Sequence, residues 1–217
     1  MNRVGLIGGT FDPIHNGHLQ LGQIVLDRFG LDRVMYIPAA TPPHKSQADV
    51  SNRRHRLGML KIALADRENM DISDIEMTRH GLSYTFDTLT LLTREGKPST
   101  RYHFVIGTDA IGEIETWYRW QELLVATNFI VAVRPGSSVK KIQELIGRNG
   151  FEPDSANGER WVHHRQLNEI VFLADRTVDI SSTDIRSRIR SGRTWKHMVP
   201  ESVGDYICSN NLYGALN

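Results

Sequence analysis

Short apolar runs alternate with stretches of helical periodicity along most of the chain. The runs have the length of buried strands, roughly four to eight residues, and several end at Gly or Pro. They predict strands at residues 4–7, 34–37, 70–77, 102–106, 129–133 and 170–173. Between them, apolar residues recur every three or four positions and predict helices at residues 17–29, 51–66, 85–94, 121–126, 138–148 and 182–191. For the first helix, Asn16 is the expected N-cap and Gly30 the expected C-terminal stop.

This alternation predicts an α/β fold, a doubly wound parallel sheet with helices on both faces. In such a sheet, ligands bind at the carboxyl ends of the strands. We expect residues 1–217 to form a single domain with a small C-terminal helical part at about residues 182–213. Residues 150–164 are rich in Gly, Asn, Asp and Ser, and we interpret them as a surface loop.

The composition narrows the function classes. With 26 Lys and Arg against 25 Asp and Glu, the formal charge is +1, so no large basic field is expected for a nucleic acid or a membrane surface. The lone cysteine, Cys208, excludes an internal disulfide and a thiolate metal cluster, and it suits a reducing compartment. No apolar run has the length of a membrane span. We expect a cytoplasmic enzyme or binding domain with no nucleic-acid partner and no membrane partner.

The segment from Gly8 to His18, GGTFDPIHNGH, follows the first predicted strand and leads into a helix. Backbone N–H groups at such a turn can face an anion, and glycines allow close approach. His15 and His18 are three positions apart, so a helical start places both imidazoles on one side, where they can donate to phosphate oxygens. The segment matches neither the dinucleotide fingerprint nor the P-loop. It indicates a different kind of phosphate-binding turn.

A second polar cluster, ISSTDIR, runs from Ile180 to Arg186 at the start of the last predicted helix. Hydroxyl groups and free N–H groups at a helix start form an anion site, and the Arg186 guanidinium adds a planar pair of donors. The two clusters therefore form a matched pair of phosphate-binding helix starts.

Together these segments resemble the signatures of the HxGH nucleotidyltransferase superfamily, with GTFDPIHNGH as its HxGH motif and ISSTDIR as its companion motif. Further segments are similar to bacterial nicotinate-nucleotide adenylyltransferases. These are Pro38 with Pro42-Pro43-His44-Lys45, Ser83-Tyr84-Thr85 with Asp87-Thr88, Gly107-Thr108-Asp109, Thr116-Trp117-Tyr118 and Arg134-Pro135-Gly136. The resemblance covers Val4 to about Tyr213 and is weakest at residues 137–168. It implies a Rossmann-like nucleotidyltransferase fold and adenylyl transfer from ATP to nicotinate mononucleotide, in NAD biosynthesis.

The resemblance also implies which residues contact ATP. The catalytic residues would be His15, His18 and Arg186, with His18 stabilising charge as pyrophosphate leaves. Arg186 would grip the β- and γ-phosphates, and Gly107 and Asp109 would meet the adenosine ribose. The other implied ATP-binding residues are Gly8, Gly9, Thr10, Phe11, Ile180, Ser181, Ser182 and Thr183.

For the acceptor, the resemblance implies that Trp117 stacks on the pyridine ring. Backbone N–H groups near Thr85 and Tyr118 would bind the nicotinate carboxylate, and His44 and Lys45 would lie near the acceptor phosphate. The remaining implied contacts are Asp12, Tyr84 and Arg134. Mg²⁺ is expected to arrive with ATP, held by phosphates and water without protein metal ligands. A homo-oligomer is left open.

Several alternatives remain at this point. Another acceptor is compatible with the same chemistry, namely pantetheine phosphate, flavin mononucleotide or nicotinamide mononucleotide. A non-catalytic nucleotide sensor could use the same cavity, although it would not need His15, His18 and Arg186 together. A histidine-based metal-binding protein is the weakest alternative, because the nine histidines are scattered.

Overall fold

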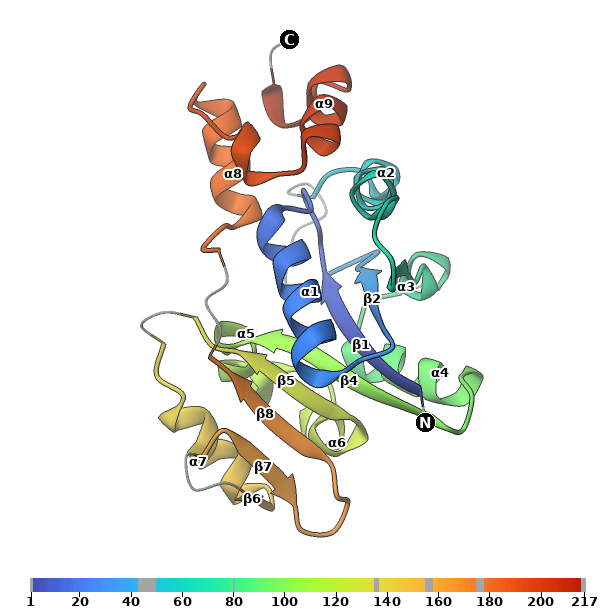
Figure 1. Ribbon diagram of the computed structural model, residues 1–217, viewed down its shortest axis with the longest axis vertical. Helices are drawn as coiled ribbons and strands as arrows, with labels where there is room; N and C mark the ends of the chain where they lie inside the picture. The colour runs from blue at the N-terminus through green and yellow to red at the C-terminus, as the bar shows by residue number, and fades with distance from the viewer. Residues whose placement is uncertain are drawn as a thin grey trace.

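A computed structural model describes residues 2–42, 50–79, 81–134, 137–154, 158–174 and 178–215. These residues form an eight-stranded sheet in the order β3-β2-β1-β4-β5-β8-β7-β6 (Figure 1). The strands are β1 (Asn2–Gly9), β2 (Arg33–Pro38), β3 (Met70–Ile72), β4 (Thr100–Gly107), β5 (Asn128–Ala132), β6 (Phe151–Pro153), β7 (Arg160–His163) and β8 (Glu169–Leu173). The strand order runs outward from β1 in one direction and from β4 in the other, so the switch point for ligand binding lies between β1 and β4.

Helices cover both faces of the sheet, as the pattern of apolar residues predicts. They are α1 (Asn16–Phe29), α2 (Arg53–Leu64), α3 (Ile75–Thr78), α4 (Thr85–Glu95), α5 (Thr108–Gly112), α6 (Trp120–Ala126), α7 (Lys140–Arg148), α8 (Ser182–Arg190) and α9 (Glu201–Ser209). The described residues also include the 3₁₀ turns η2 (Ile114–Thr116), η3 (Lys196–Met198) and η4 (Leu212–Gly214). In Figure 1, α1 crosses the front of the sheet, and α4, α5 and α6 lie behind it.

Alternate side chains of the central strands enter two different hydrophobic cores. On β4, Val105 packs into the core shared with α1, α2, α8 and α9, whereas Phe104 and Ile106 pack against α4 to α7. On β5, Ile130 and Phe129 divide in the same way. This period of two follows from the pleat of a strand. It confirms an α/β fold with a mostly parallel, doubly wound sheet.

Two sequence predictions about the strands are wrong in detail. The strand expected at residues 70–77 ends at Ile72, and α3 follows, because β3 lies at the edge of the sheet and, among the described strands, pairs with β2 alone. The loop expected at residues 150–164 contains β6 and β7, which pair antiparallel with each other and with β8. Phe151 is 1% exposed, so burial of one aromatic ring stabilises strands in a segment whose composition favours turns. Consequently the sheet is mostly, rather than wholly, parallel.

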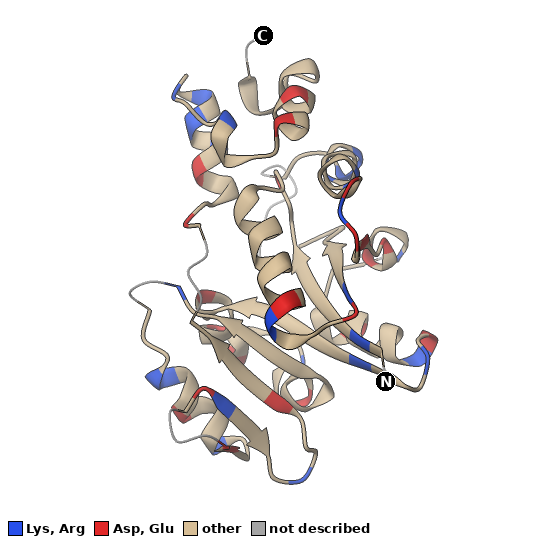
Figure 2. Cartoon of the chain, in the orientation of Figure 1, with Lys and Arg blue, Asp and Glu red and all other residues tan. Residues whose placement is uncertain are grey.

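Charged residues of both signs are spread over the elements drawn in Figure 2, in line with a formal charge of +1. Among the described residues, no helix combines the length and hydropathy needed to traverse a bilayer. The C-terminal helices α8 and α9 lie beside α1 and α2, at the end of the molecule where β1 terminates (Figure 1). They therefore lie near the predicted phosphate-binding turn.

A glycine in α1 tests this packing. A Cβ at Gly22 would lie 2.1 Å from Tyr36 Oη, a buried hydroxyl that donates to the carbonyl of His18. Gly22→Ala should therefore lower the free energy of unfolding by about 1–3 kcal/mol in urea titrations, despite the better helix propensity of alanine. Gly112→Ala is the control, because a Cβ there meets no atom within 4 Å. Equal stability of the two variants would contradict this packing.

Candidate active site

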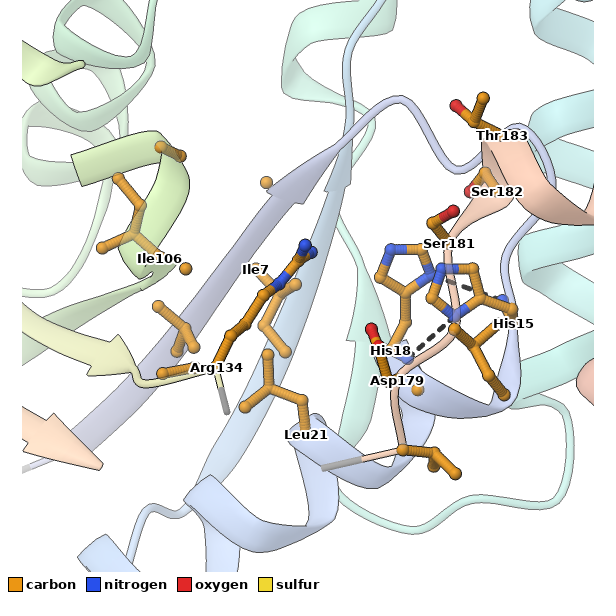
Figure 3. Close-up of a pocket in the computed structure, with 18 of the residues that line it drawn as sticks. Ile7, His15, His18, Leu21, Ile106, Arg134, Asp179, Ser181, Ser182 and Thr183 are labelled. Carbon is orange, nitrogen blue, oxygen red and sulfur yellow. Dashed lines mark hydrogen bonds between the residues drawn. The ribbon is translucent and has the colours of Figure 1, made fainter. Parts of the chain in front are cut away.

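A cavity of about 390 Å³ opens at the carboxyl ends of β1, β4 and β5 (Figure 3). We call it the histidine cavity. Its lining includes Gly8, His15, His18, Gly107, Arg134, Ile180, Ser181, Ser182 and Thr183. The structure therefore brings together both predicted phosphate-binding clusters, although they are more than 160 residues apart in the sequence.

His15 and His18 cap the start of α1 reciprocally. The His18 backbone N–H donates to His15 Nδ1, and the His15 backbone N–H donates to His18 Nδ1, each over 3.3 Å. The two rings stack with their centroids 3.6 Å apart. The prediction of Asn16 as N-cap is therefore wrong by one position. An imidazole nitrogen can accept a backbone N–H as a serine oxygen does, and His18 at the third helical position completes a capping box.

These bonds determine which ring nitrogen carries the proton. Because Nδ1 of each ring accepts a backbone N–H, the neutral form carries its proton on Nε2. Burial, with a contribution from the Arg134 charge, lowers the pKa of His15 to about 4. Burial, His15 and Arg134 hold the pKa of His18 well below its usual value. At neutral pH both side chains are thus uncharged Nε2–H donors.

The start of α8 contacts the turn between β1 and α1. Ser181 is the N-cap, and its side chain accepts from the Asp184 N–H over 3.1 Å. Ser182 Oγ donates to the carbonyl of Pro13 over 2.9 Å. Arg186 Nη1 donates to the carbonyl of Asp12 over 2.7 Å, and Arg186 is not among the residues that line the cavity.

Arg134 extends into the histidine cavity opposite His15 and His18 (Figure 3). Its guanidinium pairs with the Asp109 carboxylate over 2.8 Å, and both side chains are more than half exposed. Arg134 was expected to contact the acceptor, but it lies with the residues expected to contact ATP. Any ribose that binds Asp109 must share that carboxylate with Arg134.

A second cavity, of about 380 Å³, adjoins the first. We call it the aromatic cavity. Its lining includes the predicted acceptor residues Tyr84, Thr85, Trp117 and Tyr118. It shares Gly8, Phe104, Ala110 and Trp117 with the histidine cavity, so the two spaces have a common wall. Gly9 and Thr10, which were expected to contact ATP, line this cavity.

The side chains of Phe11 and Asp12 line neither cavity. The Phe11 ring is 2% exposed and packs edge-on against the His18 ring, with centroids 5.0 Å apart. Asp12 is also 2% exposed, and its carboxylate accepts from the Ser51 N–H and the Tyr213 hydroxyl. The predicted contacts of His44 and Lys45 fall outside the described residues.

Buried Glu76 shapes the aromatic cavity and was missed in the sequence. Its Oε1 accepts from Thr88 Oγ1 over 2.7 Å. Burial raises the pKa of Glu76, and hydrogen bonds from Thr88 and Ser83 oppose that shift. Ser83 Oγ in turn accepts from the N–H groups of Ala40 and Thr41, over 3.0 and 3.2 Å. This network joins the loop after β2 to the start of α4, and no local pattern around Glu76 indicates it.

Arg56 was also missed, because it lies in an Arg-rich stretch that reads as a solvated helix face. It is 1% exposed, and its guanidinium donates to the carbonyls of Ser51, Thr10 and Ala39. Thr10 and Ala39 line the aromatic cavity, so this buried cation holds two parts of one wall. Within the described ranges, no group of three or more His, Cys, Asp or Glu side chains is arranged to hold a metal ion.

Comparison of the sequence with known proteins shows the family of this chain. Residues 6–188 match the cytidylyltransferase-like family. The chain is 37% identical over 211 residues to a probable nicotinate-nucleotide adenylyltransferase of Thermoanaerobacter sp. (strain X514), covering 97% of this chain and 94% of that protein. It is 38% identical over 211 residues to a protein of the same name from Moorella thermoacetica, with coverage of 97% and 91%.

A solved structure shares the fold. Plasmodium falciparum nicotinic acid mononucleotide adenylyltransferase, complexed with NaAD, superposes with a TM-score of 0.76 at 20% identity, over 98% of each chain. The paired histidines, the start of α8 and the full-length similarity agree, and the chain belongs to the nicotinate-nucleotide adenylyltransferase family of cytidylyltransferase-like proteins.

Proposed function

We propose that this protein transfers the adenylyl group of ATP to nicotinate mononucleotide, forming nicotinate adenine dinucleotide and pyrophosphate. The observation that carries the proposal is the pair of adjoining cavities. One is lined by hydrogen-bond donors that suit phosphate groups, and the other is lined by aromatic rings. Gly8 and Trp117 line both cavities, so the cavities lie next to each other. Two substrates bound in them would have their phosphates side by side.

ATP would bind in the histidine cavity. The Nε2–H groups of His15 and His18 and the hydroxyls of Ser181 and Thr183 supply hydrogen-bond donors, and Arg134 supplies positive charge. The first N–H groups of α8 have no partner inside the helix, and they favour an anion. Uncharged imidazoles suit this role, because they are donors that need no proton exchange before the phosphates bind.

The aromatic cavity suits a pyridine ring. Trp117 offers a flat face, and Tyr84 and Tyr118 lie against each other with ring centroids 4.6 Å apart. Thr85 is the first residue of α4, so its N–H has no intrahelical partner and can donate to a carboxylate. A carboxamide would direct its own NH₂ group at such a donor, which disfavours nicotinamide.

The reaction needs no protein base. An oxygen of the mononucleotide phosphate, already ionised, attacks the α-phosphorus of ATP and forms the new P–O bond. The bond from the α-phosphorus to the bridging oxygen breaks, and its electron pair leaves with pyrophosphate. Catalysis then consists of positioning and of stabilising the leaving charge, a role that we assign to His18 and its neighbours.

Mg²⁺ would enter with ATP as part of the substrate, bound by phosphate oxygens and water, the ligands that this ion prefers. It would neutralise charge on the phosphates. The side chains of His15, Ser181 and Thr183 would contact the remaining phosphate oxygens.

Replacement of His18 separates catalysis from binding. His18→Ala should lower kcat by about 100-fold, as expected for one preorganised donor, because a hydrogen bond to the leaving group is lost. The dissociation constant for a non-hydrolysable ATP analogue, measured by calorimetry, should rise by less than about tenfold. His164→Ala is the control, since His164 is exposed on the turn after β7. Unchanged turnover in His18→Ala would contradict the proposal that His18 stabilises the leaving pyrophosphate.

Acceptor choice tests the proposed function directly. Pyrophosphate release from ATP and Mg²⁺ should be faster with nicotinate mononucleotide than with nicotinamide mononucleotide, by about 100-fold in kcat/KM. This factor corresponds to a lost charged hydrogen bond and an unpaired donor, about 3 kcal/mol. Pantetheine phosphate should give no release. Preference for another acceptor would contradict the assignment of nicotinate mononucleotide as the substrate. If no acceptor gave pyrophosphate release, the proposed enzymatic activity would be wrong.

The Ser83 network predicts a different effect. Ser83→Ala removes the hydroxyl that accepts from Ala40 and Thr41, which should loosen the aromatic cavity and raise the KM for nicotinate mononucleotide about tenfold. The KM for ATP should not change. Thr90→Ala, which removes an exposed hydroxyl bonded within α4, is the control. Parallel rises in both KM values would contradict a local role.

A further inference from the structure

The turn between β1 and α1 is held by residues near the other end of the chain. Ser182 and Arg186 donate hydrogen bonds to carbonyl groups of this turn. The carbonyl of His197 accepts a third bond, from Asn16 Nδ2 over 3.0 Å. Tyr213 contributes its hydroxyl, which donates to Asp12 Oδ1 over 2.6 Å across 201 positions of sequence. The catalytic histidines thus stand on a turn whose supports come from α8, η3 and η4.

The bond from Tyr213 satisfies a buried charge. Asp12 is 2% exposed, and its other carboxylate oxygen accepts from the Ser51 N–H over 3.1 Å. The buried Arg56 guanidinium is a nearby positive charge and interacts favourably with Asp12. A buried carboxylate is costly when a hydrogen bond is missing. Burial and the Asp12 charge raise the pKa of Tyr213, so its hydroxyl remains protonated and able to donate.

The backbone of this C-terminal turn is strained. Tyr213 has φ 60° and ψ 12°, and Asn211 has φ 49°, so two side-chain-bearing residues adopt the left-handed region. Asparagine adopts this region readily, but for Tyr213 it costs about 1–2 kcal/mol and persists only when the surroundings hold the residue there. Two anchors surround Tyr213, its own bond to Asp12 and the burial of Ala215, which is 6% exposed.

We propose that Tyr213 is a positioning residue for adenylyl transfer, which holds the turn carrying His15 and His18 in its catalytic geometry through Asp12. This inference rests on the proposed function. Asp12 lies three residues before His15, and its carbonyl accepts from Arg186. Release of its carboxylate would therefore let both histidines and the start of α8 shift together, and displacements of about 1 Å reduce rates strongly.

The proposal predicts a selective loss. Ser83, Glu76 and Arg56 hold the walls of the aromatic cavity directly, whereas Tyr213 bonds to Asp12, which lines neither cavity. Tyr213→Phe should lower kcat about tenfold, equivalent to about 1.4 kcal/mol, because the leaving-group donors are misplaced. The KM for nicotinate mononucleotide should change by less than about twofold.

Tyr206→Phe is the matched control. Tyr206 also belongs to the C-terminal region, and its hydroxyl lies 3.1 Å from His55 Nδ1, joining α9 to α2 without touching the turn. Both variants lose a tyrosine hydroxyl, and Tyr213→Phe should lower the melting temperature more, because it removes a hydrogen bond from the buried Asp12 carboxylate. Only Tyr213→Phe should lose kcat, measured per folded protein well below the melting temperature.

Wild-type protein in the same assay distinguishes two failures. If it forms no nicotinate adenine dinucleotide, the proposed function is overturned. If it is active and Tyr213→Phe retains the kcat of Tyr206→Phe, the positioning role is overturned. Should Tyr213→Phe be unfolded, Asp12→Asn, whose amide oxygen still accepts from Tyr213, should keep more kcat than Asp12→Ala, and equal losses would contradict the proposal.

Discussion

The reciprocal hydrogen bonds between His15 and His18 are the interaction on which the rest of the proposed active site depends. Each ring accepts the other residue's backbone N–H through Nδ1, so both rings have one tautomer and one orientation. The same bonds begin α1 directly after β1 and aim its N-terminus at the carboxyl edge of the sheet. Helix start, proton position and cavity lining are therefore consequences of one local arrangement.

Buried charged residues extend this arrangement outward. Arg56 gathers the carbonyls of Thr10 and Ala39, Glu76 receives the hydroxyl of Thr88, and Asp12 receives that of Tyr213. Each charge is satisfied by hydrogen bonds from segments distant in sequence, and each would be costly if a partner were removed. These bonds join separate loops and helix starts to one another around the two cavities.

The sequence predicts the central strands, the helices on both faces and two helix starts of matching phosphate-binding chemistry, at Gly8–His18 and Ile180–Arg186, because periodicity and helix-start chemistry are local. It does not predict β6 and β7, since pairing with β8 overrides a turn-rich composition. Likewise, nothing local marks Arg56 as buried among exposed arginines. Asp12 illustrates the same limit at the candidate site. Its motif suggests a contact with a ligand, but its carboxylate is buried and accepts from Tyr213, 201 residues away.

The most direct test of the central claim is the protonation state of the two histidines. Long-range ¹H–¹⁵N spectra of histidine-labelled protein at about pH 7, assigned with His15→Asn and His18→Asn variants, report the proton on each ring nitrogen. We expect both residues to show a protonated Nε2 and an unprotonated Nδ1 in the free protein. A proton on Nδ1 of either ring, or a doubly protonated imidazolium, would contradict the reciprocal capping of α1.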